Sequence, residues 1–231
     1  MNFYLQQIID WSEVWAPIVP LAFYYICRPK ADWSKILLAY LLFALVNNGL
    51  STFFWKQIRL GLYENMKQSF PYLYNADGTY TNVPLYHIGS LVRLLLFSVF
   101  FSLIVYRIKK IAWIFAALFI CLFFYLFFIK GDIRDFSSAF MATEAALLLI
   151  YCLIFYFQIL SNEKITISNT HSFWTVTGLS IYVVINFPIF LFYNVLSKQA
   201  ENFAINIWDI HNISYLVLCL FIAKSFYADK Q

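Results

Sequence analysis

The sequence predicts an all-α fold, a polytopic bundle of seven transmembrane helices. Of its 231 residues, 62% are hydrophobic and only 12% are charged, and the mean hydropathy is +0.71. A soluble domain is roughly half apolar and about a quarter charged, so this chain has too few charged residues to cover a water-facing surface. All 7 tryptophans lie at or near the ends of long apolar runs, which is typical of membrane spans whose indole rings sit at the headgroup level.

Seven apolar runs define the expected helices. An α-helix needs roughly 20 apolar residues to cross the hydrocarbon core of a membrane. The first run is short, and Pro17 and Pro20 favour a kink in it, as Pro188 does in the sixth. No basic residue precedes the first run, so we expect a retained span and not a signal peptide. Residues 1–231 should form a single helical bundle domain, with spans at Val14–Cys27, Trp33–Trp55, Tyr86–Tyr106, Ile111–Ile129, Ser137–Leu160, Phe173–Leu196 and Trp208–Tyr227.

The distribution of Lys and Arg predicts the orientation. Short cytoplasmic loops carry an excess of these residues, and most of those in this chain fall at the inner side if the N-terminus is outside. We therefore expect an N-out, C-in protein of the cytoplasmic (inner) membrane. The longest connection lies between the second and third spans. In it, strand formers on both sides of Asp77-Gly78 predict a small β-hairpin on the outer face.

Polar groups within the spans are the candidate site. A charge inside a bilayer is costly unless it is paired or hydrated, so each such residue is a functional candidate. The predicted topology puts nearly all of them in the outer half, which favours a polar pocket reached from outside. The predicted ligand-binding residues are Arg93, Glu144, His87, His211, Asp209 and Asn48, with Asn47, Asn186 and Asn194 as further polar groups.

A structural role for the same residues is equally compatible with the sequence. At 1.5 Å per residue, Arg93 and Glu144 lie roughly 9–10 Å into the third and fifth spans from the same side. They can therefore form an internal ion pair that fixes helix register if these spans are neighbours. The asparagines could likewise join helices by hydrogen bonds.

Other chemistries find little support in the sequence. A three-histidine metal site would need His87, His171 and His211 together, but His171 precedes the sixth span on the inner side. Lys224 lies too near the end of its span for a retinal Schiff base and is better interpreted as a snorkelling anchor. The serines have no His and acid at a common depth, and the four cysteines are isolated, as small buried hydrophobes often are. We therefore predict no catalytic residue, metal or cofactor, and the thinly spread charge gives no nucleic-acid surface.

Several stretches carry a resemblance to a known family. They are Leu85-Tyr86-His87-Ile88, Phe136-Ser137-Ser138 with Glu144, Phe173-Trp174 with Gly178 and Ile181-Tyr182, and Ile207-Trp208-Asp209-Ile210-His211-Asn212-Ile213. Over these stretches the chain resembles a family of small, mostly uncharacterised seven-span membrane proteins common in Bacteroidota. The resemblance implies a seven-helix fold and a sensory or ligand-binding module. The chain departs from the family pattern at Arg93, where an acidic residue is expected about two turns after the histidine.

These observations favour a non-enzymatic membrane sensor or ligand-binding protein. Its expected partners are the lipid bilayer, a small-molecule or lipid ligand, and a membrane or cytoplasmic protein that receives the signal. The first alternative is a small-solute transporter or channel subunit, which would need a water path to the inner side. The second is an intramembrane enzyme, for which the sequence offers no converging nucleophile and base.

Overall fold

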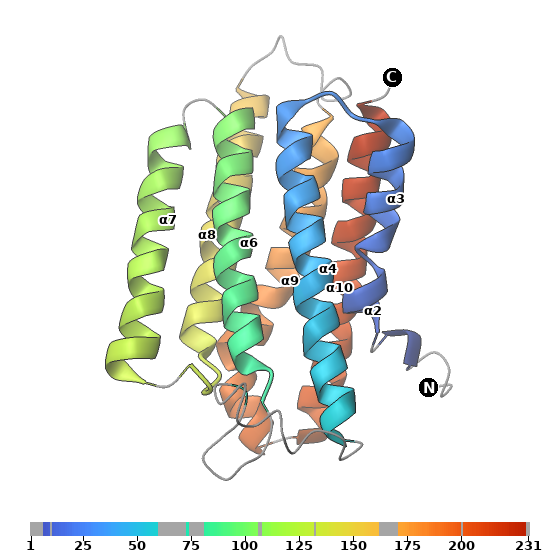
Figure 1. The fold of residues 1–231 in the computed structure, drawn as a ribbon. Helices are drawn as coiled ribbons and strands as arrows, with labels where there is room; N and C mark the ends of the chain where they lie inside the picture. The colour runs from blue at the N-terminus through green and yellow to red at the C-terminus, as the bar shows by residue number, and fades with distance from the viewer. Residues whose placement is uncertain are drawn as a thin grey trace.

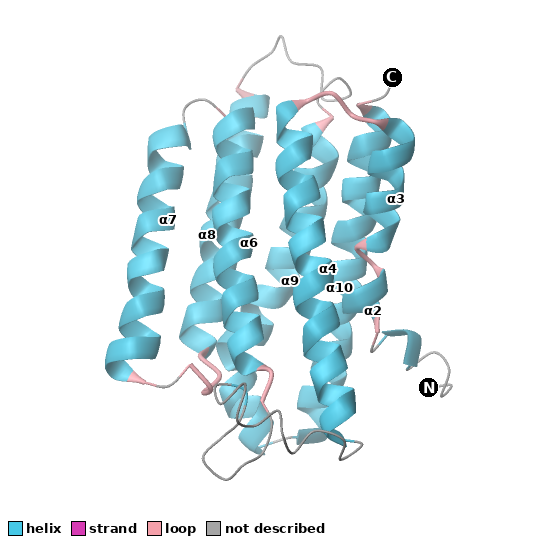
Figure 2. Cartoon of the chain, viewed as in Figure 1, coloured by secondary structure: helices cyan, strands magenta, loops and turns pink. Residues whose placement is uncertain are grey.

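The structure is a computed structural model that describes residues 7–9, 11–59, 73, 81–105, 108–131, 133–161, 171–199 and 201–229. The described chain is almost wholly helical and contains no strand (Figure 2). The helices run alternately up and down in one bundle (Figure 1). They are α2 (Ser12–Trp15), α3 (Ile18–Cys27), α4 (Asp32–Arg59), α6 (Val83–Ile104), α7 (Lys109–Phe124) with its π-helical continuation η3 (Tyr125–Lys130), α8 (Ser138–Leu160), α9 (Ser172–Gln199) and α10 (Glu201–Ala228).

Six of these helices are long and apolar enough to cross a membrane. Large apolar side chains on the outside of the bundle, such as Phe157 at 73% and Leu160 at 77% exposure, fit contact with lipid and not with water. The prediction of a multi-pass helical membrane protein is therefore confirmed. Within the described residues, the spans are Asp32–Phe54, Val83–Ile104, Lys109–Ile129, Ser138–Leu160, Ser172–Leu196 and Asn206–Ala228.

The first predicted span is divided into two short helices. Pro17 lies at the junction of α2, with 4 residues, and α3, with 10, because proline lacks the N–H that would continue the helical ladder. α3 ends at Cys27, and the next residue, Arg28, has a left-handed backbone with φ of 51° and donates its N–H to the carbonyl of Tyr24. Pro29 follows, which is a common way to stop a helix. Besides the six long helices, a further crossing at the start of the chain would thus need α2 and α3 together.

The two ends of the bundle differ in what they hold. We call the end that carries α2 the α2 end; it also holds the end of α4 and the beginnings of α6, α8 and α10 (Figure 1). The opposite end, here the C-terminal end, holds the last turn of α10. There the Asp229 carboxylate accepts hydrogen bonds from the backbone N–H groups of Lys30 and Ala31, which joins α10 to the turn between α3 and α4.

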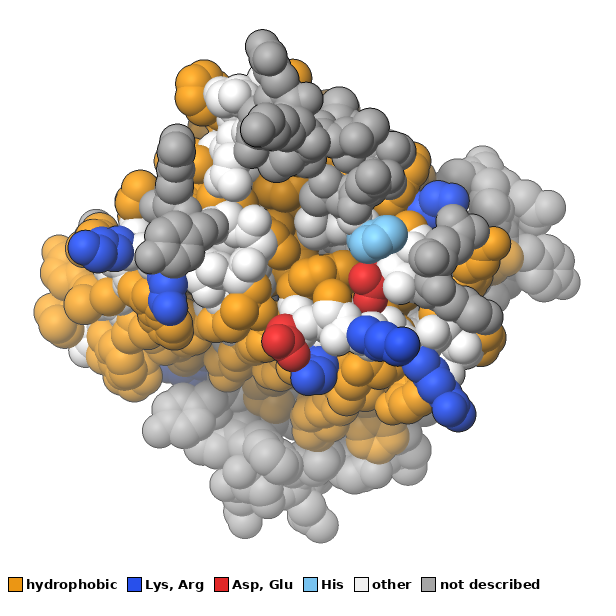
Figure 3. Space-filling model, turned by 90° about the horizontal axis from the view of Figure 1, so that it is seen from above, with side chains coloured by type: hydrophobic (Ala, Val, Ile, Leu, Met, Phe, Trp, Pro, Cys, Tyr) orange, Lys and Arg blue, Asp and Glu red, His pale blue; other side chains and the backbone are white. Residues whose placement is uncertain are grey.

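Basic side chains are spread over the C-terminal end. Figure 3 views this end and shows Lys and Arg side chains around it, with apolar side chains on the flanks. Lys224 lies over two aromatic rings, with its Nζ 5.5 Å from the Trp174 ring centre and 5.3 Å from that of Tyr227. The Lys224 ammonium thus lies beside aromatic rings near the end of α10. The other described basic residues at or beside this end are Arg28, Lys30, Lys35, Lys109 and Lys110.

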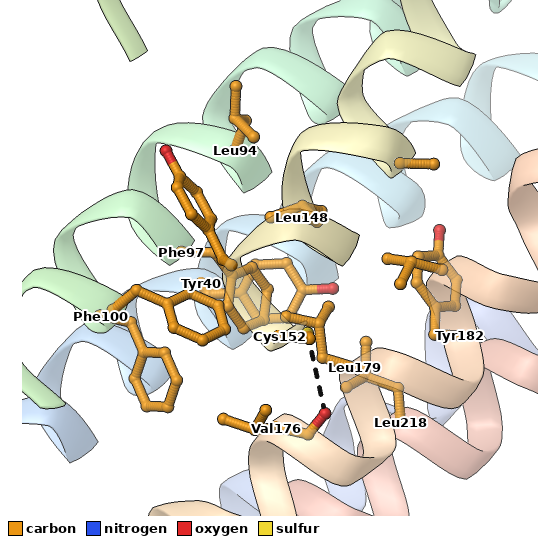
Figure 4. Packing of buried hydrophobic residues seen from close by; sticks show 14 of the residues in the cluster. Tyr40, Leu94, Phe97, Phe100, Leu148, Cys152, Val176, Leu179, Tyr182 and Leu218 are labelled. Carbon is orange, nitrogen blue, oxygen red and sulfur yellow. Dashed lines mark hydrogen bonds between the residues drawn. The ribbon is translucent and has the colours of Figure 1, made fainter. Parts of the chain in front are cut away.

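The core is continuous and rich in aromatic side chains. Leu94 and Phe97 from α6, Leu148 from α8, Leu179 from α9 and Leu218 from α10 are all at most 1% exposed, and Figure 4 shows this packing. α9 and α10 approach closely at Gly178, where a Cβ would lie 2.5 Å from the Cβ of Phe221.

The predicted hairpin between the second and third spans lies outside the described residues, apart from Leu73 and Thr81. The backbone N–H of Thr81 donates to the carbonyl of Leu73 at 2.9 Å. The hairpin itself stays a prediction.

Candidate functional site

A polar cavity lies inside the bundle at the α2 end. Its volume is about 40 Å³, whereas one water molecule needs roughly 10–15 Å³. It can therefore hold a few water molecules or a ligand of a few heavy atoms. Five of the long helices and α2 contribute to its wall, which consists of Glu13, Tyr40, Phe43, Ala44, Asn47, Asn48, Tyr86, Gly89, Ser90, Arg93, Met141, Tyr182, Phe190, Trp208, His211 and Tyr215.

Arg93 and Glu144 form an ion pair between α6 and α8 at this cavity. The Arg93 guanidinium donates from Nε to Glu144 Oε1 at 2.5 Å and from Nη2 to Oε2 at 2.7 Å. Ser90 Oγ also donates to Oε2, at 2.6 Å. The Glu144 side chain is 1% exposed and that of Arg93 is 14% exposed. The predicted contact is therefore confirmed, and Arg93 is the partner that reaches the cavity.

A second polar chain joins α2 to α9 and α10. His211 Nε2 lies 3.1 Å from Glu13 Oε1, and His211 Nδ1 lies 2.5 Å from Asn186 Oδ1. The Asn186 amide donates to Ser214 Oγ and to the Tyr182 carbonyl, both at 2.7 Å. Every polar atom of this buried chain thus has a partner, as buried polar groups require.

Glu13 is held by two further helices. Tyr86 of α6 donates its hydroxyl to Glu13 Oε2 at 3.2 Å, and the Asn48 amide of α4 donates to the Glu13 backbone carbonyl at 2.9 Å. Together with His211, these contacts hold the short helix α2 against the side of the cavity.

Aromatic rings surround His211 and line the deep side of the cavity. The ring centre of His211 lies 4.9 Å from that of Trp208, 5.4 Å from Phe190 and 5.8 Å from Tyr182. The Arg93 guanidinium lies over the Tyr182 ring, 5.3 Å from its centre, in a cation–π arrangement. The Tyr182 hydroxyl is buried and has no hydrogen-bond partner among the described residues. It is a donor that a water molecule or ligand in the cavity could satisfy.

The structure brings together some of the predicted site residues. Arg93, His211 and Asn48 line the cavity, and Glu144 binds Arg93 from behind it. Asp209 is half-buried on α10 and is not among the described residues that line the cavity.

His87 lies elsewhere, in an aromatic pocket between α6, η3 and α8. Its Nδ1 bonds the Ile133 carbonyl at 3.1 Å, and its Nε2 accepts the backbone N–H of Ser137 at 3.3 Å. The ring packs 4.2 Å from Phe127 and is fully buried. Both ring nitrogens form hydrogen bonds with the backbone, so this histidine is neutral and stabilises the fold. The prediction that His87 lies at the binding pocket is therefore not met, since it does not line the cavity.

Several cavity residues were not predicted. Glu13, Tyr86 and Ser90 contribute polar atoms, and the three tyrosines at positions 40, 182 and 215 contribute hydroxyl groups. Glu13 had one usable signal, since it is an acid between Trp11 and Trp15 at the start of an apolar run.

Among the described residues, no three His, Cys, Asp or Glu side chains lie close enough together to hold a metal ion. His171 lies at the C-terminal end, where its carbonyl accepts a hydrogen bond from Ser225, far along the bundle from the cavity. The polar groups of the site are therefore suited to hydrogen bonding, ion pairing and proton exchange.

Comparison of this chain with protein-family models, with curated proteins and with solved structures finds no match.

Proposed function

We propose that this chain is a non-enzymatic sensor or ligand-binding protein that takes a small polar ligand in the cavity at the α2 end. It would lie in the cytoplasmic membrane as a seven-helix bundle, with α2 and α3 as the first crossing and the N-terminus outside. The basic residues at the C-terminal end support this orientation, because cytoplasmic ends of spans carry the excess of Lys and Arg.

The observation that carries the proposal is the buried, incompletely paired polar surface of the cavity. Arg93 uses Nε and Nη2 to bind Glu144, which leaves the donors of Nη1 for another partner. The Tyr182 hydroxyl is a further donor with no described partner. Both residues line the same space. A ligand that presents hydrogen-bond acceptors, such as a carboxylate or an amide carbonyl, suits these donors.

A layer of apolar side chains favours a sensor over a transporter. Toward the C-terminal end, the cavity is followed by buried leucines of one hydrophobic cluster, each at most 1% exposed: Leu37, Leu94, Leu148, Leu179 and Leu218. Figure 4 shows the last four of them. Water cannot pass such a layer without rearrangement of the helices. A small-solute transporter or channel subunit remains the alternative function, and an intramembrane enzyme is the second alternative.

In a sensor, ligand binding must change contacts with a partner. The ligand would alter how α2, α4, α6 and α10 pack at the α2 end, since each contributes to the wall. A ligand shifts a conformational equilibrium by its differential affinity for the two states. The changed helix packing would then be transmitted through the bundle to a membrane or cytoplasmic protein.

Thermal stability with two isosteric probes tests the proposal. Acetate and acetamide each have four heavy atoms and a carbonyl acceptor but differ in charge. We expect at least one to raise the melting temperature of the purified protein in lipid nanodiscs, increasingly with concentration. Tyr182→Phe should weaken the effect. The proposed site would be contradicted if neither probe stabilised the wild type. It would also be contradicted if both probes stabilised the wild type and Tyr182→Phe equally. Uptake of the stabilising probe into proteoliposomes would favour the transporter.

A further inference from the structure

We propose that Glu13 and His211 together form a proton-binding site, and that the bound proton holds α2 closed over the cavity. This inference rests on the proposed function in one respect, since it assigns a regulation to the same cavity. Its test needs no ligand, so the two proposals can fail separately.

The hydrogen-bond network fixes the proton on His211 Nδ1. Ser214 Oγ donates its only hydrogen to the His211 carbonyl at 2.7 Å, so toward Asn186 it can only accept. The group of Asn186 that faces Ser214 is therefore its NH₂, and the group that faces His211 Nδ1 is its carbonyl oxygen. Because that oxygen only accepts, Nδ1 carries a hydrogen.

The contact between His211 and Glu13 then requires a second proton. Nε2 and Glu13 Oε1 lie 3.1 Å apart. A neutral imidazole protonated at Nδ1 has only a lone pair at Nε2, and a carboxylate oxygen only accepts. Two acceptors do not form a hydrogen bond at this distance. The geometry therefore contains one shared proton, either on Nε2 beside a carboxylate or on Glu13 beside a neutral imidazole. The pair carries no net charge in both forms.

No neighbouring charged group of the described part that faces the cavity compensates the charge of the pair. Across the cavity, the charge of Arg93 on α6 is neutralised by Glu144 on α8. The Tyr86 hydroxyl from α6 donates to the other oxygen of Glu13. Beyond these, the titratable groups of the described part that face the cavity are the phenols of α4, α9 and α10, namely Tyr40, Tyr182 and Tyr215, and Asp209 lies two residues before His211 on α10. Loss of the shared proton would leave one uncompensated negative charge in the wall.

The position of Glu13 links this proton to access. α2 has only 4 residues, and Glu13 forms hydrogen bonds with residues of α4, α6 and α10. Without the proton, the contact with His211 changes from a hydrogen bond to a repulsion, and the carboxylate gains by moving into water. Because Glu13 itself lines the cavity, its departure opens the wall at the α2 end. The cavity should thus be closed at low pH and open at high pH.

Tryptophan fluorescence of the full chain in nanodiscs tests the proton site. Trp208 packs on His211, so its emission responds to the charge and position of the imidazole, and subtraction of the Trp208→Phe signal isolates it. We expect the Trp208 emission to change in one step with pH in wild type. The same step should appear in Asp32→Asn, because this variant removes a carboxylate at the far end of the bundle. Glu13→Gln supplies an amide N–H to a neutral His211 and should show no step. A step that persists in Glu13→Gln, or no step in wild type, would overturn the proton site.

Labelling of a cysteine in the wall tests the closure by α2. Ala44 lines the cavity and is 7% exposed. Above the pH of the fluorescence step, we expect Ala44→Cys to react faster with a water-soluble thiol reagent. Its labelling rate should then exceed that of Ala44→Cys/Glu13→Gln on the order of tenfold, which corresponds to the free energy of one lost charged hydrogen bond. The ratio removes the intrinsic pH dependence of the thiol, and the parent chain gives the background of the native cysteines. A ratio that stays constant with pH would refute the closure.

Discussion

Replacement of Glu144 by Gln should destabilise the bundle by about 3 kcal/mol, at the lower end of the cost of breaking a buried ion pair. The carboxylate is 1% exposed and neutralises the Arg93 guanidinium, so the amide leaves a cation without its counter-charge. Two features limit the loss. Ser90 can still donate to the amide oxygen, and Arg93 is 14% exposed at a cavity that can hold water.

Arg93→Met should cost more, roughly 4–5 kcal/mol. It leaves the less exposed partner without its cation, and only Ser90 then donates to the carboxylate. The double variant removes both charges. Because interacting groups couple by up to about 3 kcal/mol, we expect its loss to be about 2–3 kcal/mol smaller than the sum of the two single losses.

The melting temperature in detergent measures these losses. For a chain of this size, 1 kcal/mol corresponds to about 2–4 °C, so each single variant should melt about 6–20 °C below wild type. Asp32→Asn is the matched control: it breaks an ion pair of 2.8 Å whose side chains are 66% and 80% exposed, and it should leave the melting temperature unchanged. Additive losses of the two buried variants would refute the reasoning, since they would mean that the groups do not interact.

Three further predictions concern packing, the second histidine and orientation. Gly178→Ala should lower stability by about 1–3 kcal/mol through overpacking between α9 and α10, whereas Gly49→Ala, with nothing within 4 Å of its Cβ, should be neutral or stabilising in the same melting assay. His87→Leu should cost about 1–3 kcal/mol, because it leaves two buried backbone groups unpaired, yet retain the pH step of Trp208 fluorescence; loss of the step would give His87 a role at the cavity. In intact cells, an impermeant thiol reagent should label Asp135→Cys at the α2 end and spare Lys110→Cys at the C-terminal end; the reverse pattern would overturn the N-out orientation.

Much of the fold follows from the sequence because a run of roughly 20 apolar residues in a membrane has helix as its natural conformation. The fifth span illustrates this: it was predicted at Ser137–Leu160, and α8 covers Ser138–Leu160. The last span was predicted to begin at Trp208, but α10 begins at Glu201, since polar residues extend a helix beyond the hydrocarbon without an apolar signal. The division of the first run depends on Pro17, whose effect the sequence suggested without showing that α2 would be only one turn.

The contacts of the site were predictable where the depth of two side chains in the membrane was enough to bring them together. Arg93 and Glu144 enter the membrane from one side and lie at equal depth, so their contact needed only neighbouring helices. Glu13 was missed because its partner is 198 residues away and because an acid before a span usually lies in water. His87 was assigned to the pocket because sequence shows side chains and not the backbone groups, here of Ile133 and Ser137, that satisfy both of its nitrogens.

The separation of Glu13 from His211 has a consequence for the order of assembly. At 5–20 residues per second, the ribosome needs about 10–40 s to reach the second partner after making the first. During that interval a carboxylate within the hydrocarbon would be costly, so we expect α2 to stay at the membrane surface while α4, α6 and α8 insert. We therefore expect this single turn to dock only after the last helix has been inserted.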